Sequence, residues 1–150
     1  MPVEVLGIDH MYLSVRDPAR SEAFYDALMG VLGFRKASSA IDGDPHVHYY
    51  NRQLGLTLRP ARDLAREHDP YAAGLHHLCL RVPGAGAVDR AVGERRAAGI
   101  EVSEPREYPE YSDGYYATFL TDPDGIRLEI CNFWERRRRR MFDWEHEADG

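Results

Sequence analysis

Two histidines and one glutamate in this sequence have the residue types and the spacing to bind a divalent metal ion. His10 and His77 each begin the pattern His-x-x-Leu-x-Val, and Glu129 lies in the alternating segment 126–130. Successive side chains of a β-strand point to opposite faces, so each of these residues lies opposite its strand's apolar residues. A carboxylate on a core strand is expensive to bury unless it is paired or bound to a metal. Because two histidines and one carboxylate form a recognised ligand set, we predict a metal site at His10, His77 and Glu129.

The strands that would carry these ligands belong to an internal repeat. His77 follows His10 by 67 residues, and Val82 follows Val15 by the same 67. A repeat of this length indicates two copies of one strand–helix–strand–strand–strand unit. Neither unit would bury both faces of its sheet alone, so we expect the two to close over a shared interior.

Turn and helix signals predict the elements of each copy. Asp17 and Pro18 are typical of a helix N-cap and a first helical position, and Gly33 is typical of a helix end. The expected strands of the first copy are residues 8–15, 34–37, 46–51 and 54–59, with a turn at 42–45. The second copy is expected to have a helix over residues 85–98 and strands over residues 75–82, 100–103, 115–121 and 126–131.

Composition excludes several classes of function. The apolar fraction of 43% and the charged fraction of 29% are ordinary for a globular protein. A net charge of −6 argues against a general nucleic-acid binder, and no apolar run approaches the ~20 residues needed to span a bilayer. The start lacks the features of a signal peptide, and the two cysteines do not form a disulfide framework. We therefore expect a cytoplasmic protein that binds a small-molecule substrate, with no nucleic-acid or membrane partner.

Several short motifs occur along the chain, each of which is weak evidence for a protein family by itself but specific when all occur together. They are Ile8-Asp9-His10, Asp17-Pro18, Leu32-Gly33-Phe34, His77-Leu-Cys-Leu-Arg-Val and the Asp-Pro-Asp-Gly-Ile-Arg-Leu-Glu segment of residues 122–129. In these motifs the chain resembles the vicinal oxygen chelate superfamily, which includes glyoxalase I, extradiol dioxygenases, and fosfomycin- and bleomycin-resistance proteins. The resemblance covers roughly residues 6–133.

This resemblance implies an α+β fold in which two βαβββ modules form an open, cupped mixed sheet around a metal cavity. The modules would span about residues 6–60 and 74–133 of a single domain, with a connector at 61–73 and a charged tail at 134–150. The metal ligands of the family would map onto His10, His77 and Glu129, the same three residues that strand parity selects.

The chain departs from glyoxalase I at one position. Enzymes of that kind have a fourth ligand, a carboxylate on the last strand of the first module. Matching Gly55 to Gly125 places Arg59 opposite Glu129, and a two-residue slip places Thr57 there, so neither alignment supplies a carboxylate. Three ligands with open positions are closer to the extradiol dioxygenases. Fe²⁺ or Mn²⁺ is therefore the favoured ion, with Zn²⁺ or Ni²⁺ as alternatives.

Further side chains are candidates for substrate binding and catalysis. Strand parity places five of them on the ligand faces, where we expect substrate contacts: Tyr12, Thr57, Arg59, Cys79 and Arg81. His48 is a candidate acid or base, and Tyr115 is a candidate hydrogen-bond donor near the ion. His76 should lie on the face opposite His77. The alternative to the metal hypothesis is that the histidines are hydrogen-bonded interior residues and Glu129 forms a salt bridge with Arg59 or Arg81.

Two functions compete. The first is a divalent-metal-dependent enzyme acting on a small substrate with neighbouring oxygens, either an extradiol-type dioxygenase or a lyase, isomerase or epimerase. The second is a bleomycin-resistance-type protein that sequesters a ligand without catalysis. The three candidate ligands favour the enzyme, because binding modules of this family need none. A sheet edge compatible with two-fold pairing also leads us to expect a homodimer.

Overall fold

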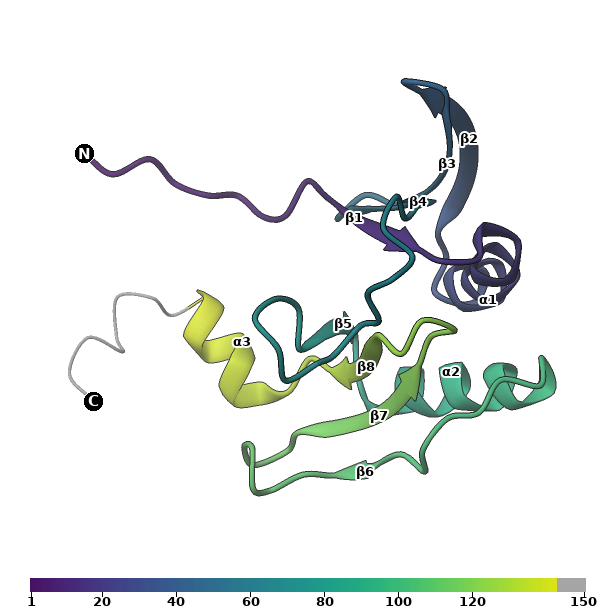
Figure 1. Cartoon of the computed structure of the whole chain (residues 1–150). Helices are drawn as coiled ribbons and strands as arrows, with labels where there is room; N and C mark the ends of the chain where they lie inside the picture. Colours follow the sequence, from purple (N-terminus) through teal and green to yellow (C-terminus); the bar gives the residue numbers. More distant parts are fainter. Residues whose placement is uncertain (143–150) are drawn as a thin grey trace. The chain divides into compact units, whose positions relative to one another are not determined.

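The structure is a computed structural model that describes residues 1–142 and divides into two compact units. Unit 1 comprises residues 1–68, and unit 2 begins at residue 69. The end of the expected charged tail, residues 143–150, lies outside the described residues. The chain can be followed by colour in Figure 1, and each unit is described below by itself.

Unit 1 is one βαβββ module built on a four-stranded mixed sheet (Figure 1). Its elements are β1 (His10–Val15), α1 (Pro18–Val31), β2 (Arg35–Ile41), β3 (Asp44–Tyr50) and β4 (Gly55–Pro60). The strand order is β1-β4-β3-β2, in which β1 and β4 are parallel and the other neighbours are antiparallel.

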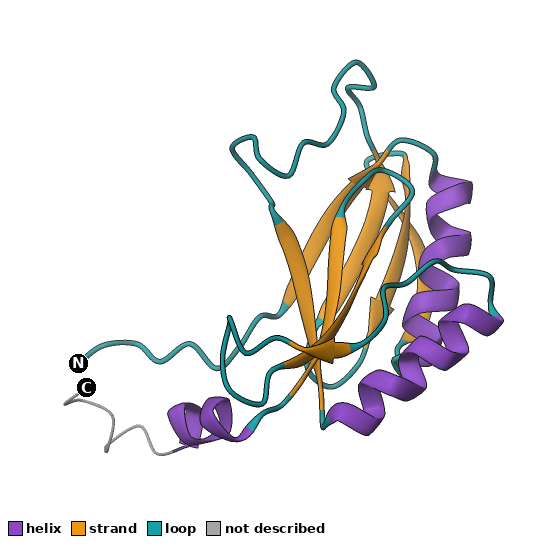
Figure 2. Cartoon of the chain, turned by 90° about the horizontal axis from the view of Figure 1, so that it is seen from below, coloured by secondary structure: helices purple, strands orange, loops and turns teal. Residues whose placement is uncertain are grey.

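Unit 2 repeats this arrangement and continues into a short helix. Its elements are β5 (His77–Val82), α2 (Ala85–Ala97), β6 (Arg106–Glu107), β7 (Tyr116–Thr121), β8 (Arg127–Asn132) and α3 (Glu135–Phe142). The strand order is β5-β8-β7-β6, with β5 and β8 parallel. Figure 2 distinguishes the strands of the two sheets from the helices. The predicted α+β fold of two βαβββ modules with open mixed sheets is confirmed.

The strand expected at residues 100–103 is wrong, because β6 begins only at Arg106. Ser103 alone reaches β7, where its N–H donates to the carbonyl of Phe119 at 2.9 Å. Pro105 has no N–H group and cannot continue such a ladder. In unit 1, by contrast, β2 is longer than expected. Asp42 and Gly43 have φ values of 52° and 82°, the backbone of a tight two-residue hairpin turn, so pairing continues up to the turn itself.

The helix of unit 1 begins and ends where its capping residues predict. The carboxylate of Asp17 accepts a hydrogen bond from the N–H of Arg20 at 3.1 Å, and Pro18 occupies the first helical position. At the other end Gly33 has a φ of 77°, and the N–H of Phe34 donates to the carbonyl of Met29 at 2.9 Å. This left-handed glycine stops the helix and returns the chain to the sheet.

Each sheet has a buried apolar face and a more polar face opposite. In unit 1 the paired residues Tyr49 and Leu56 are buried, and the Tyr49 ring lies 6.3 Å from the ring of Tyr25 in α1. Because cross-strand partners share a face and alternate residues change it, His10 and His48 lie on the other side. No helix in the described part of the chain has the length and apolarity that a membrane crossing requires.

A polar cluster joins the sheet of unit 1 to α1. The hydroxyl of Tyr49 donates to the carboxylate of Asp26 at 2.8 Å, and the ammonium of Lys36 donates to Asp26 and to Glu22. Burial, together with the hydrogen bond to Asp26, raises the pKa of Tyr49 above its ordinary value. The hydrogen bonds to Asp26 and Glu22 raise the pKa of Lys36. Both groups therefore bind their protons more tightly in the folded chain.

This cluster predicts a loss of stability in alkali. An unfolded tyrosine ionises near pH ~10 while folded Tyr49 keeps its proton, so the folded chain binds more protons and its free energy of unfolding falls as pH rises above about 10. Lys36 acts in the same direction above its unfolded pKa of 10.5. Urea unfolding at about pH 8 and about pH 10.5 should show that Tyr49→Phe reduces the alkaline loss by roughly 1 kcal/mol. The exposed Tyr111→Phe is the matched control, and an unchanged pH slope in Tyr49→Phe would contradict the assignment.

Candidate functional site

Glu129 is a buried carboxylate in the middle of the sheet of unit 2. It lies on β8 between Cys79 of β5 and Phe119 of β7, and only 3% of its surface is exposed. The hydroxyl of Tyr115 donates a hydrogen bond to Oε1. The other oxygen, Oε2, lies 3.4 Å from Nε2 of His77. Since a buried carboxylate is costly without charged or hydrogen-bonded partners, Tyr115 and His77 account for its position.

The imidazole of His77 is oriented by its neighbour in sequence. Nδ1 of His77 lies 2.7 Å from Nδ1 of His76, and this contact turns Nε2 toward Glu129. The expectation that His76 lies on the face opposite His77 is wrong, because both line the same pocket. The physical reason is that β5 begins at His77, so strand parity does not extend back to His76.

His10 of unit 1 has a comparable arrangement. Its Nδ1 lies 2.6 Å from a carboxylate oxygen of Asp9. An ionised carboxylate can only accept, so Nδ1 carries the proton and a neutral ring has its lone pair on Nε2. His10 pairs with Gly55 of β4, and a Cβ at Gly55 would lie 3.3 Å from the Cβ of His10. Glycine at this position therefore leaves room for the imidazole.

These contacts match the chemistry of ligands to a divalent ion. Histidines that bind metals commonly give their second ring nitrogen to a carboxylate or another acceptor, and Asp9 serves His10 in this way. His10 belongs to unit 1, whereas His77 and Glu129 belong to unit 2. Among the described residues, no three His, Cys, Asp or Glu side chains are grouped closely enough to hold a metal ion. Within unit 2, two of the predicted donors, Nε2 of His77 and Oε2 of Glu129, lie next to each other.

The strand registers decide which residue of unit 1 corresponds to Glu129. His10 pairs with Gly55 as His77 pairs with Arg127, so two residues further along Thr57 occupies the position of Glu129. Thr57 is buried, and its hydroxyl lies 2.9 Å from Nδ1 of His48. The counterpart of Glu129 is thus a hydroxyl group, not the Arg59 of the other alignment.

Both nitrogens of His48 have partners within the sheet of unit 1. Nδ1 contacts the hydroxyl of Thr57, and Nε2 lies 2.7 Å from the hydroxyl of Ser39. Tyr12 lies nearby, with its ring edge-on to His10 at 5.5 Å and to His46 at 5.8 Å. The structure therefore brings Tyr12, His48 and Thr57 together on the face that carries His10.

Both arginines predicted to contact substrate have partners within the protein. Arg59 forms an ion pair with Asp44, which also binds Arg62 at 3.1 Å. Arg81 lies over the ring of Phe133 at 4.3 Å, and its guanidinium is 3.0 Å from the sulfur of Met141 in α3. Within unit 2, Arg81 forms no salt bridge with Glu129 among the described residues, contrary to one form of the alternative hypothesis.

The thiol of Cys79 lies beside Glu129, its direct partner on the neighbouring strand. Its sulfur is 3.9 Å from the hydroxyl of Tyr115, and it forms a hydrogen bond with the thiol of Cys131 on the neighbouring strand. This hydrogen bond, followed by burial, raises the pKa of Cys79 above its ordinary value. A thiol in this state is a poor nucleophile, so Cys79 is suited to packing or to polar contact.

Two pockets, one in each unit, hold seven of the ten candidate residues, and Arg59, Cys79 and Arg81 line neither of the two. The pocket of unit 2 has a volume of about 300 Å³ and is lined by His76, His77, Tyr111, Tyr115, Phe119, Arg127 and Glu129. A pocket of about 430 Å³ in unit 1 includes Asp9, His10, Tyr12, His48 and Thr57 in its lining. Asp9, Phe119 and Arg127 are absent from the predicted site. The signals that could have found them are adjacency to His10 for Asp9, and alternation along the strand for Phe119 and Arg127.

Comparisons with known proteins agree with this architecture. The family model of the Glyoxalase/Bleomycin resistance protein/Dioxygenase superfamily matches residues 7–130. The chain is 27% identical over 124 residues to the uncharacterized protein YqjT of Bacillus subtilis. The aligned region covers 81% of this chain and 94% of YqjT. The fold of this chain is similar to that of a glyoxylase/bleomycin resistance protein/dioxygenase domain from Frankia sp. EAN1pec, with a TM-score of 0.70, 22% identity and coverage of 86% and 98% of the two chains.

A further likeness is to a protein solved with a metal ion. The fosfomycin resistance protein FosX of Listeria monocytogenes, in complex with Mn(II) and a sulfate ion, is similar in fold with a TM-score of 0.58 and 16% identity. The match covers 92% of this chain and 98% of FosX.

Proposed function

The chain belongs to the glyoxalase/bleomycin resistance protein/dioxygenase superfamily, and we propose that it is a divalent-metal-dependent enzyme acting on a small substrate with neighbouring oxygen atoms. The observation that carries this proposal is the buried carboxylate of Glu129. One of its oxygens accepts from Tyr115, and the other faces Nε2 of His77. An imidazole beside a carboxylate is a common pair of metal ligands.

The ion would be held by His10, His77 and Glu129. Two neutral imidazoles and one carboxylate suit Fe²⁺ or Mn²⁺, and Mn(II) in FosX supports that choice, with Zn²⁺ or Ni²⁺ as alternatives. When bound, such an ion supplies a Lewis acid that polarises adjacent substrate oxygens. Asp9 holds the tautomer of His10 that leaves Nε2 free to bind, and Tyr115 holds the carboxylate of Glu129.

Other residues of the chain have roles in binding and proton transfer under this proposal. His48, held between Thr57 and Ser39, is the candidate acid or base, and Tyr12 beside it would contact substrate. Cys79 would pack beside the carboxylate. The open coordination positions of a three-ligand site favour extradiol-type dioxygenase chemistry, with lyase or isomerase chemistry next.

The proposal includes the assembly and the location of the protein. We propose a homodimer, because closed two-fold pairs are the commonest assembly of small proteins and each sheet has an edge that can pair. We also propose a reducing cytoplasmic location, since the neighbouring thiols of Cys79 and Cys131 are both free.

Metal analysis combined with an activity panel tests the function. Protein purified without chelator should contain close to one divalent ion per chain, and turnover of a catechol should require that ion. A methylglyoxal–glutathione adduct should not be turned over, because Thr57 occupies the position of the fourth carboxylate. The panel also includes epoxide antibiotics. Metal-free protein that binds a ligand without turnover would instead support the sequestering function, and strong glyoxalase activity would contradict the three-ligand site.

A further inference from the structure

One row of cross-strand partners runs across the polar face of unit 1 from a candidate metal ligand to an arginine. His10 of β1 pairs with Gly55 of β4, Gly55 pairs with Tyr50 of β3, and Tyr50 pairs with Arg35 of β2. Directly paired residues lie on the same face of a sheet. The row His10–Gly55–Tyr50–Arg35 is therefore a continuous surface with an imidazole at one end and a guanidinium at the other.

The dimensions of this row suit a small organic molecule. Neighbouring strands are ~4.8 Å apart, so the backbones of His10 and Arg35 are separated by three such steps, about 14 Å. Gly55 has no side chain, which leaves an open position between His10 and the ring of Tyr50. A flat group could lie in this gap against the Tyr50 ring.

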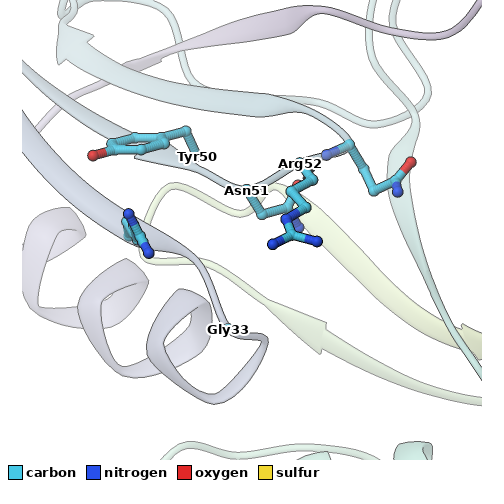
Figure 3. A pocket seen from close by; sticks show the side chains of 6 residues that line it. Gly33, Tyr50, Asn51 and Arg52 are labelled. Carbon is cyan, nitrogen blue, oxygen red and sulfur yellow. Dashed lines mark hydrogen bonds between the residues drawn. The ribbon is translucent and has the colours of Figure 1, made fainter.

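A second arginine lines the same pocket as Arg35. Arg52 is at the tip of the turn between β3 and β4, where the side chain of Asn51 accepts hydrogen bonds from the N–H groups of Gln53 at 2.7 Å and Leu54 at 3.0 Å. These bonds hold the turn in one shape. Figure 3 shows Arg52 projecting from the turn into the pocket whose lining includes Tyr50, Asn51 and Gly33.

The pocket between Arg35 and this turn has a volume of about 610 Å³. It is lined by Gly33, Arg35, Tyr50, Asn51, Arg52 and Gln53. Tyr50, Asn51, Arg52 and Gln53 also line the adjoining pocket that contains His10 and His48. The two pockets therefore share a wall, and a ligand seated at the arginines could extend toward His10.

The charges of this pocket are not balanced by any carboxylate of the described residues. Arg16, Arg59 and Arg62 of the same unit each form an ion pair with a carboxylate. Arg35 and Arg52, by contrast, form no ion pair with any carboxylate of the described residues, although the chain carries a net charge of −6. Two guanidinium groups that face one pocket and have no carboxylate partner among the described residues are suited to bind an oxyanion through charge-assisted hydrogen bonds.

We propose that Arg35 and Arg52 bind the anionic group of the substrate, a carboxylate, phosphate or phosphonate, while the rest of the molecule lies along Tyr50 and Gly55 toward His10. The extension to His10 rests on the proposed metal-dependent function, whereas anion binding at the two arginines does not. The substrate class is accordingly an organic anion with its charged group at one end and its paired oxygens at the other.

Binding to metal-free protein tests the anion site independently of catalysis. The full chain, treated with chelator and desalted, is titrated calorimetrically with benzoate, phenylphosphonate and the neutral benzamide. Both anions should bind saturably, benzamide should bind at least ~10-fold more weakly than benzoate, and Arg35→Gln/Arg52→Gln should weaken anion binding at least ~10-fold. Arg20→Gln/Arg90→Gln removes the same charge from exposed positions on α1 and α2 and should bind like the original chain.

Three outcomes would overturn the proposal: no saturable anion binding, equal affinity for benzoate and benzamide, or an equal loss of anion affinity in the two double variants. Thermal midpoints of both double variants, followed by circular dichroism, check that all chains are folded. His10→Ala should retain phenylphosphonate binding, so a failure of the metal hypothesis and a failure of the anion site give different results.

Discussion

Metal content should fall at least ~10-fold when His10, His77 or Glu129 is replaced by alanine. Each change removes one of three proposed ligands and leaves an incomplete shell, and even residues that merely orient ligands typically change affinity by about 10–100-fold. The effect should be largest for Glu129, whose buried oxygen already faces Nε2 of His77. Elemental analysis of protein purified without chelator measures it directly.

Two further variants separate ligand loss from loss of the fold. Glu129→Gln keeps the volume of the side chain and an oxygen that can accept from Tyr115, but it removes the charge. It should lose metal as Glu129→Ala does while keeping its thermal midpoint closer to that of the original chain. Glu101→Ala, at an exposed position in the same unit, should retain full metal content. Full occupancy in Glu129→Ala would refute the ligand assignment.

Mixed dimers of two defective chains should recover one metal site per dimer if the sites are composite. Of the proposed ligands, His10 belongs to unit 1 and His77 and Glu129 belong to unit 2, so a composite site would combine unit 1 of one chain with unit 2 of its partner. In a dimer of His10→Ala with Glu129→Ala, one such combination is intact and the other carries both substitutions. About half the wild-type metal should then bind per mixed dimer.

Co-expression of the two variants with different affinity tags provides the mixed dimers, and the two homodimers serve as metal-poor references. Absence of metal from mixed dimers would place each site within one chain. Light scattering on the original chain gives the assembly itself, and a single monomeric species at micromolar concentration would refute the homodimer.

Local patterns in the sequence were sufficient to predict the fold of two modules. The helix that starts at Pro18 follows from the capping chemistry of Asp17, and its end follows from the left-handed backbone that Gly33 permits. The 67-residue repeat from His10 to His77 identified two βαβββ modules. Alternation alone also placed Glu129 opposite Leu128 and Ile130, because the direction of a side chain in a strand depends only on its position along that strand.

Such local patterns could not predict which residues pair between neighbouring strands. The sequence left both Arg59 and Thr57 open as the counterpart of Glu129, and only the registers of the two parallel pairs select Thr57. The misplaced strand at residues 100–103 has the same origin. Its residues have strand-like character, but a strand exists only where a neighbour accepts its hydrogen bonds, and Pro105 interrupts the ladder with β7.

The sequence by itself therefore determined the family, the two modules and the face on which each candidate ligand lies. Only the tertiary structure decided what those side chains touch: Tyr115 on Glu129, Asp9 on His10, Asp44 on Arg59, and the row that ends at Arg35. The physical reason is the distance along the sequence over which each feature is determined. Side-chain direction and helix caps are set within a few neighbouring residues, whereas these contacts join residues whose proximity depends on strand register, on turn geometry or on side-chain conformation.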